Sequence, residues 1–260
     1  MKGWFQEIWG YRELLYFFVW RDIKIRYKQT ALGAMWAIIQ PFFTMVIFTV
    51  FFGKLAKIPS EGIPYPIFYY TALVPWTYFS VALSFSANSL VSNSHLLTKI
   101  YFPRLVLPAS PTIGGLLDFG IASILLIGLM LFYKVPLSWG LLLWPVIVIP
   151  LLFLALGLGM IFASINVKYR DVKYAIPFFI QLMLFLTPII YPTNIIPGNY
   201  RLLMLLNPLA GIIDAFRSSV HPSRHIEWGV LTLSVAITAL VFLIGLLYFK
   251  RTERAFADII

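Results

Sequence analysis

The sequence predicts an all-α integral membrane protein with six membrane-spanning helices. The clearest sign is the segment from Ala34 to Gly53, which holds twenty residues and no charged side chain. A helix of about 20 apolar residues is long enough to cross the hydrocarbon core of a bilayer. More such segments follow, and over the whole chain 60% of the residues are hydrophobic and 12% are charged. A soluble domain has about a quarter of its residues charged.

Composition also narrows the classes of function. The net charge is +10, but the charged residues lie between the apolar segments. This pattern favours a role in orientation and in contact with anionic lipid headgroups over nucleic-acid binding. The chain has no cysteine, which excludes disulfides, thiolate metal sites and cysteine nucleophiles. No cleavable signal peptide is expected, because the apolar piece Leu14–Trp20 is too short and is followed by Arg21.

Residues 1–33 are expected to form an amphipathic helix in the membrane interface. Apolar and aromatic residues recur there at spacings of three and four, as on one stripe of a helix: Trp4, Ile8, Tyr11, Leu15 and Phe18. Arg21, Lys24 and Lys28 then fall on one helical side. That basic side could contact lipid phosphates or a partner protein.

Residues 34–260 are expected to form a single transmembrane domain. Its six apolar segments are Ala34–Gly53, Ile67–Val91, Pro108–Tyr133, Trp139–Ile165, Tyr174–Tyr191 and Gly229–Phe249. Pro41 is expected to kink the first, and the second contains Pro75. In the fourth, Ala155, Gly159 and Ala163 are four apart, and small residues at this spacing let helices approach closely, inside the subunit or at a dimer contact.

The segment 192–228 differs from these spans. It contains four prolines: Pro192, Pro197, Pro208 and Pro222. Its apolar piece is interrupted by Asn207–Pro208 and is too short to span. Irregular backbone survives at membrane depth only where it is buried in protein or lines a wet cavity. We therefore predict two short re-entrant helices that dip into one leaflet, with an amphipathic surface loop as the alternative.

Lys and Arg are unevenly divided between the two sides of this six-helix arrangement. The side of the N-terminus receives fourteen of them and the other side six. Because cytoplasmic loops carry the excess of these residues, both termini are predicted in the cytoplasm.

Motifs for catalysis are missing from the sequence. There is no GxxxxGK[ST] motif, so the chain is not expected to bind nucleotide through a P-loop. GxSxG, HExxH and DxD-type motifs are also missing. Asp118 is the acid that lies well inside a predicted span. It is either a functional group or a hydrogen-bonded acid between helices, and the sequence offers it no visible cationic partner.

Two close pairs of polar residues also need an interpretation. His221 and His225 are four apart, but Pro222 lies between them and no third ligand is near, so a surface loop is favoured over a metal site. Asp214 and Arg217 are three apart and are expected to pair with each other.

Aromatic residues are numerous in the first, second and fifth predicted spans. Their flat faces could pass along the carbon faces of sugars, while Tyr and Trp keep a polar group. Singly, each such ring is more simply explained by lipid contact or packing. As a set they make a channel lined by aromatic rings plausible: Phe42, Phe43, Tyr69, Tyr70, Trp76, Phe178, Phe179 and Tyr191.

The polar joints between the apolar segments resemble those of a known family. The segment RYKQTALGAMWAIIQP, Arg26–Pro41, resembles the junction before the first span in the permease subunits of bacterial polysaccharide ABC exporters, of ABC-2 type. This family moves O-antigen, capsule and teichoic acid precursors. Further similar segments occur in the family's order: NSHLLTKIYFPRLVLP (Asn93–Pro108), NVKYRDVKYAIPF (Asn166–Phe178) with TPIIYP (Thr187–Pro192), and NPLAGIIDAFR (Asn207–Arg217).

The resemblance implies a homodimer of six-span subunits with a channel between them, working with two copies of a cytoplasmic ABC ATPase. That partner would bind ATP and Mg, and this chain would need no cofactor. The loop 92–104 would supply a coupling helix to the ATPase, and the loop 168–173 a second contact. The residues implied are His95, Leu96, Leu97, Lys99, Tyr101, Arg104, Arg170 and Asp171. Re-entrant helices in 192–228 would close the outer mouth.

The function expected from the resemblance is export of a lipid-linked, O-antigen-like polysaccharide from the cytoplasm across the inner membrane. A glycan cannot enter hydrocarbon unless its hydrogen bonds are replaced, and a protein-lined channel replaces them. Arg26 and Lys28 lie where a pyrophosphate-linked headgroup would approach; they could instead anchor the helix to lipid or touch the ATPase.

Three alternatives stay open. One is a drug, lipid or teichoic acid precursor exporter with the same fold. Another is a membrane glycosyltransferase, which would need paired carboxylates or a metal site. The third is an ion-coupled transporter, which would normally carry more intramembrane charge than Asp118 alone.

Overall fold

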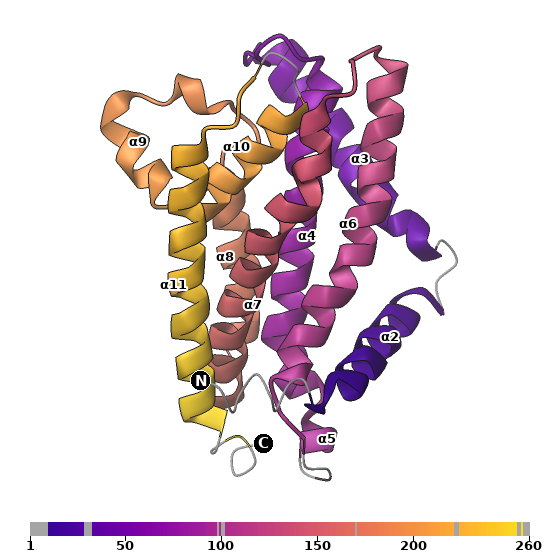
Figure 1. The fold of residues 1–260 in the computed structure, drawn as a ribbon, viewed down its shortest axis with the longest axis vertical. Coiled ribbons are helices and arrows are strands. Elements are labelled where there is room, and N and C mark those ends of the chain that lie inside the picture. The colour runs from indigo at the N-terminus through magenta and orange to yellow at the C-terminus, as the bar shows by residue number, and fades with distance from the viewer. Residues whose placement is uncertain are drawn as a thin grey trace.

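A computed structural model describes residues 10–28, 33–97, 99, 102–169, 171–220, 224–253 and 256. The described residues form helices and loops and contain no strand, which confirms the all-α prediction. Figure 1 shows long helices that run side by side between two ends of the molecule, with one oblique helix at the lower end and two short ones at the upper end.

The first half of the chain contains the oblique helix and three of the long ones. Its elements are α2 (Arg12–Lys28), η1 (Gly33–Met35), α3 (Trp36–Phe48), the π-helix η2 (Thr49–Leu55), α4 (Tyr65–Ser92), the short α5 (Ser94–Leu97) and α6 (Val106–Phe132).

The second half contains two further long helices, with a shorter one and the two short helices between them. Its elements are η3 (Trp139–Leu143), α7 (Trp144–Lys168), α8 (Val172–Leu186), η4 (Thr193–Ile195), α9 (Gly198–Leu205), α10 (Pro208–Val220) and α11 (Trp228–Glu253).

Among the described residues, four helical segments are long and apolar enough to cross a membrane: Trp36–Leu55, Val106–Phe132, Trp139–Lys168 and Trp228–Glu253. They match the predicted first, third, fourth and sixth spans. The predicted second span is α4, which is long enough with 28 residues but carries many polar and aromatic side chains. The predicted fifth span is α8, which has only 15 residues. The count of six therefore stays a prediction.

The early end of α8 has a local cause. Thr187 adopts an extended conformation, with φ −104° and ψ 141°. Pro188 follows it, and the residue before a proline is pushed out of the helical region by the proline ring. The predicted span to Tyr191 is thus wrong by about one turn of helix at its end. In contrast, α3 and α4 stay helical through Pro41 and Pro75.

The core of the molecule is built around α4. Most of this helix is buried, and it packs against α6, α7 and α10. Its polar and aromatic composition follows from this central position, because it faces protein and not lipid. A second, smaller core at the lower end joins α2, the loop before α6 and the end of α11 through Phe18, Leu97, Phe102, Phe249 and Phe256.

Small residues bring α7 close to both of its main neighbours. A Cβ on Gly159 would lie 2.1 Å from the Ser86 hydroxyl oxygen of α4, and one on Gly245 of α11 would lie 2.3 Å from the Gly157 carbonyl oxygen. Ala155 and Ala163 are fully buried. The small residues predicted to allow close approach therefore pack inside the subunit.

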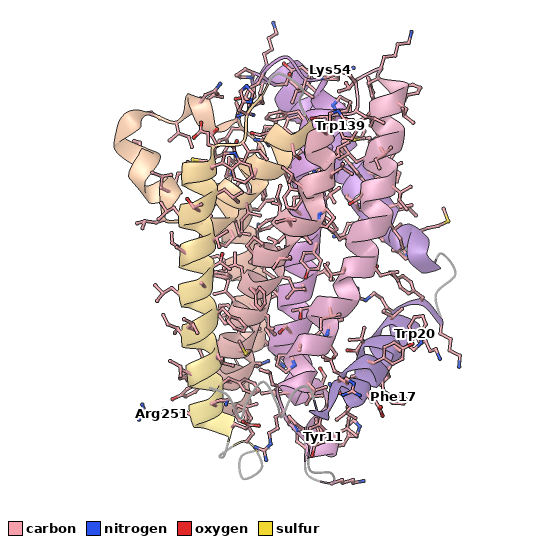
Figure 2. All side chains as sticks on the ribbon, viewed as in Figure 1. Tyr11, Phe17, Trp20, Lys54, Trp139 and Arg251 are labelled. Carbon is pink, nitrogen blue, oxygen red and sulfur yellow. The ribbon has the colours of Figure 1, made fainter. Side chains whose placement is uncertain are left out.

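The N-terminal end of α2 and the C-terminal end of α11 lie at the same end of the molecule. Figure 2 places Tyr11 and Arg251 at the lower end and Lys54 and Trp139 at the upper end. This arrangement is the one expected when the chain crosses the bundle an even number of times.

Candidate functional site

A polar seam joins α2 to α6 at the lower part of the molecule. The Ser110 hydroxyl donates to the Asp22 carboxylate at 2.6 Å, and Asp22 also accepts from Arg21 at 2.8 Å. One helical turn further along α2, the Arg26 guanidinium donates to the Asp118 carboxylate. Asp22 and Arg26 are four apart and share one face of α2, so both contact the same neighbour.

The ion pair corrects one reading of the sequence. Asp118 has a cationic partner, and that partner lies on the N-terminal helix and not in a neighbouring span. The two side chains are each 20% exposed, and the Arg26 guanidinium also lies 4.9 Å from the centre of the Phe85 ring. Spacing along the sequence could not reveal the pair, since 92 positions separate its members.

A pocket of about 240 Å³ opens beside this pair. It lies between α2, α3, α4 and α6, and its lining is mostly apolar. The polar side chains that reach it include Arg26, Gln40, Thr77 and Asp118. On α4 the lining residues are spaced three and four apart, so one helical face forms that wall.

The loop between α4 and α6 is fixed to the rest of the lower end. The Phe18 and Phe102 rings stack with their centres 5.8 Å apart. Arg104 donates from its guanidinium to the Glu253 backbone carbonyl, and its backbone NH donates to the Glu253 carboxylate at 3.4 Å. These contacts join the described part of the loop to both α2 and the end of α11.

The residues implied in ATPase contact divide by exposure. His95, Lys99 and Asp171 are exposed. Leu96 is partly buried, and Leu97 is buried in the lower core. Tyr101 and Arg170 lie outside the described residues.

A second polar cluster lies at the upper end, where it joins three loops and α10. Arg224 pairs with Glu61 and contacts the Asp214 carboxylate at 3.5 Å. Asp214 also accepts from the Thr193 hydroxyl at 3.3 Å. The cluster thus fastens α10 to the loop before α4 and to the segment before α11.

Arg217 does not form the predicted pair with Asp214. It is fully buried, donates to the Ile189 carbonyl at 3.2 Å, and places its guanidinium carbon 3.9 Å from the centre of the Phe68 ring. Within the described residues, its Nε and Nη1 have no hydrogen-bond partner. The prediction failed because Arg217 is buried and not on a surface helix. Its guanidinium contacts the Ile189 carbonyl, in the connection between α8 and η4, and the Phe68 ring instead of Asp214.

The segment 192–228 contains two short helices, as predicted. They are α9 and α10, and Asn207–Pro208 separates them. Asn207 fixes the break, because its amide donates to the Thr187 hydroxyl at 3.0 Å and its side-chain oxygen accepts from the Leu209 backbone NH at 3.1 Å. Figure 1 shows both at the upper end, with α10 between α11 and α4, and α10 is buried from Leu209 to Val220.

The aromatic residues proposed to line a channel occupy different environments. Tyr69, Tyr70 and Trp76 are buried in the main core. Phe42, Phe179 and Tyr191 are partly buried, while Phe43 is 59% and Phe178 63% exposed.

The described part of the chain was predicted to contain no metal site. That part holds no group of three or more His, Asp or Glu side chains that could hold a metal ion. His225 is exposed, and His221 lies outside the described residues. The polar groups at both ends instead join separate elements of the helical bundle.

Comparisons with known proteins agree with this helical membrane architecture. The family model described as ABC-2 type transporter matches residues 13–221. The O-antigen export system permease protein RfbA of Myxococcus xanthus is 30% identical over 256 residues, which cover 97% of each chain.

Two other relatives are similar over almost as much of their length. The O-antigen export system permease protein RfbA of Klebsiella pneumoniae is 28% identical over 244 residues, 92% of each chain. The polysialic acid transport protein KpsM of Escherichia coli is 26% identical over 249 residues, which cover 90% of this chain and 92% of that one.

Proposed function

This chain belongs to the ABC-2 type transporter family, and we propose that it is the membrane-spanning subunit of an ATP-driven exporter of lipid-linked polysaccharide. The observation that carries the proposal is the similarity over 97% of both chains to an O-antigen export permease. A capsule relative named for polysialic acid transport supports the same substrate class. These relatives are transporter permeases and not enzymes, which disfavours the glycosyltransferase alternative.

We propose that α3, α4, α6, α7, α8 and α11 are the six spans, in a bacterial inner membrane with both termini in the cytoplasm. The common end of Tyr11 and Arg251 supports an even number of crossings. The excess of Lys and Arg assigned to that end supports its cytoplasmic location. The short α8 would reach the other face through the segment that begins at Thr187, which is contacted by Asn207 and by Arg217 of α10.

The ATPase is proposed to bind at the lower end, with one copy on each subunit of a homodimer and with ATP and Mg held by the ATPase. Exposed His95, Lys99 and Asp171 would contact it, together with Arg170. Leu96, Leu97 and Arg104 would hold the loop 92–104 in place, since they pack or bond within the subunit. Tyr101 is assigned to the same contact by its position in the loop.

A channel between two subunits is proposed for the glycan. The exposed rings of Phe43 and Phe178 are suited to face it, with Phe42, Phe179 and Tyr191 beside them. The buried Tyr69, Tyr70 and Trp76 would support this wall from behind. Because Arg224 fastens α10 to Glu61 at the upper end, α9 and α10 are suited to close the outer mouth at rest.

Substrate access is proposed at α2. Lys28 is exposed and Arg26 is partly exposed, so the end of α2 presents positive charge to the phosphates of a lipid-linked headgroup. Phosphate that approached Arg26 would compete with Asp118 for the guanidinium. The double variant R26Q/K28Q should therefore lower export while the ATPase still binds.

The test is to co-express the chain with candidate cytoplasmic ABC ATPases of the same genome. Co-purification with one of them, and surface glycan that appears only with an ATPase able to hydrolyse ATP, would support the proposal. Association with no ATPase would contradict it. Export of a drug or phospholipid without glycan would favour the alternative amphiphile exporter.

A further inference from the structure

The pocket beside Arg26 and Asp118 has a mostly apolar lining but contains one polar group whose hydrogen bonds are not all formed. Asp118 presents two carboxylate oxygens, and only one of them is used. Oδ2 accepts from Arg26, whereas Oδ1 is buried and has no hydrogen-bond partner among the residues that the structure describes. A buried, unpaired carboxylate oxygen costs free energy unless a donor reaches it.

The pocket is poorly suited to an anion. The one charge on Arg26 is already matched by Asp118, so a phosphate that entered would meet an uncompensated carboxylate oxygen. A ligand that donates hydrogen bonds and carries no negative charge would satisfy that oxygen instead. Gln40 and Thr77 add further polar groups to the lining, each able both to donate and to accept.

Two aromatic rings line the same pocket with much of their surface free. Trp36 of α3 is 54% exposed and Phe85 of α4 is 53% exposed. Aromatic faces pack against apolar C–H surfaces. The space of about 240 Å³ is many times the volume that one water molecule needs, so a small polar ring can enter it.

We propose that this pocket is a carbohydrate subsite that holds one sugar residue of the lipid-linked glycan on the lower, headgroup side of the subunit. Oδ1 is covered by protein in this structure, so the Asp118 carboxylate turns toward the pocket to accept a hydrogen bond from a sugar hydroxyl. Thr77 and Gln40 contact neighbouring hydroxyls, and Trp36 packs against the C–H face of the ring. The inference rests on the proposed export function and adds to it a site for the sugar next to the phosphate-linked end. Lys28 is exposed and remains available to the phosphates.

The test is photo-crosslinking in cells that express the full chain with its ATPase. Trp36→p-benzoylphenylalanine places an aromatic crosslinker in the pocket, and Phe132→p-benzoylphenylalanine places the same group on an exposed position of α6 away from it. Adducts are detected with a glycan antibody and identified by mass spectrometry. We expect a glycan adduct at position 36 and none at position 132.

Second changes identify the polar contacts. In the position 36 background, D118N should lower the adduct yield by about tenfold, as expected when a hydrogen bond to a charged group is lost. T77V, which keeps the ion pair and the shape of the side chain, should lower the yield by about fivefold through loss of a neutral hydrogen bond. S123A on α6 lies outside the pocket lining and should leave the yield unchanged. The amount of chain in the membrane is measured for each variant.

The outcomes separate the subsite from the export function. Surface glycan without an adduct at position 36, or an adduct that neither D118N nor T77V reduces, would overturn the subsite and leave the export function standing. An adduct that contains phospholipid and no sugar would also overturn it. If the unaltered chain with its ATPase produced no surface glycan, the export function would fail and the subsite with it.

Discussion

The Arg26 guanidinium on α2 donates to the Asp118 carboxylate on α6, 92 positions later in the chain. The pair fixes the oblique helix to a long helix of the bundle at the point where the proposed substrate would arrive. Together with the Ser110–Asp22 hydrogen bond, it fastens α2 to α6 at two points.

Removal of one member of this pair should destabilise the chain more than removal of both. Loss of one partner from a buried pair costs about 3–5 kcal/mol, and because each side chain is 20% exposed, we expect about 2 kcal/mol here for R26M or D118L. The double variant R26M/D118L should recover most of this loss. Thermal unfolding of the purified chain measures it.

The same double variant separates packing from transport. Its stability should approach that of the unaltered chain, while its export stays low because Asp118 Oδ1 and the Arg26 charge are both missing. If the loss of stability in the double variant equalled the sum of the losses in the two single variants, the two residues would not interact.

Loosening of the upper polar cluster should make the resting channel leak. R224Q removes the partner of Glu61 and the contact with Asp214, so α10 loses its fastening to the loop before α4. We expect higher conductance to small ions in planar bilayers without ATP, and E61Q should act in the same direction. K54Q, at the same end, is the matched control. Conductance of R224Q equal to that of K54Q would exclude a closing role for the cluster.

The close approach of α7 and α11 should not tolerate a methyl group. In G245A the new Cβ would lie 2.3 Å from the Gly157 carbonyl oxygen, and backbone cannot move away without shifting a helix. Overpacking of this kind costs about 1–3 kcal/mol. G120A adds the same group where nothing lies within 4 Å, so its melting temperature should be unchanged or slightly raised.

A loss of stability is also expected at Gly159. The Cβ of G159A would lie 2.1 Å from the Ser86 hydroxyl oxygen and 2.6 Å from the Ser86 Cβ. Rotation of the Ser86 side chain moves the hydroxyl, at the loss of its hydrogen bond to the Pro108 carbonyl, but it does not move the Cβ, so the two helices must also shift. G120A should therefore have a higher melting temperature than both G159A and G245A, and a melting temperature of G159A equal to that of G120A would contradict the close packing of α4 and α7.

Charge at the lower loop should govern ATPase binding. Lys99 is exposed beside α5, so K99E should weaken association with the ATPase by about fivefold, the size expected for one surface charge contact. K54E, at the opposite end of the molecule, should have no effect. The measurement is the amount of ATPase that co-purifies with each variant. Equal amounts for K99E and K54E would remove Lys99 from the interface.

Much of the fold could be predicted from the sequence because membrane spans have a strong local signal. Runs of apolar residues located α3, α6, α7 and α11 to within a few residues. The break at Asn207–Pro208 likewise predicted two short helices, since proline chemistry acts locally. The end of α8 was placed too late because its apolar run continues past Thr187, where Pro188 forces an extended backbone.

Most of the candidate site could not be predicted, because its contacts join distant segments. Asp118 was recognisable as an intramembrane acid, but its partner Arg26 belongs to another helix. Arg217 had Asp214 within reach along the sequence, yet the fold gives it the Phe68 ring and the Ile189 carbonyl. Aromatic composition alone also could not separate the buried Tyr70 from exposed rings.

In the proposed function, this chain provides a protein-lined path for a glycan and a separate ATPase drives the transport. The most direct measurement is transfer of lipid-linked glycan across proteoliposomes that contain the purified chain and its ATPase. We predict that glycan becomes protected from an added glycosidase when ATP is present, and that it stays accessible when the ATPase is omitted or cannot hydrolyse ATP. Protection that is independent of the ATPase, or none in the complete system, would contradict the account.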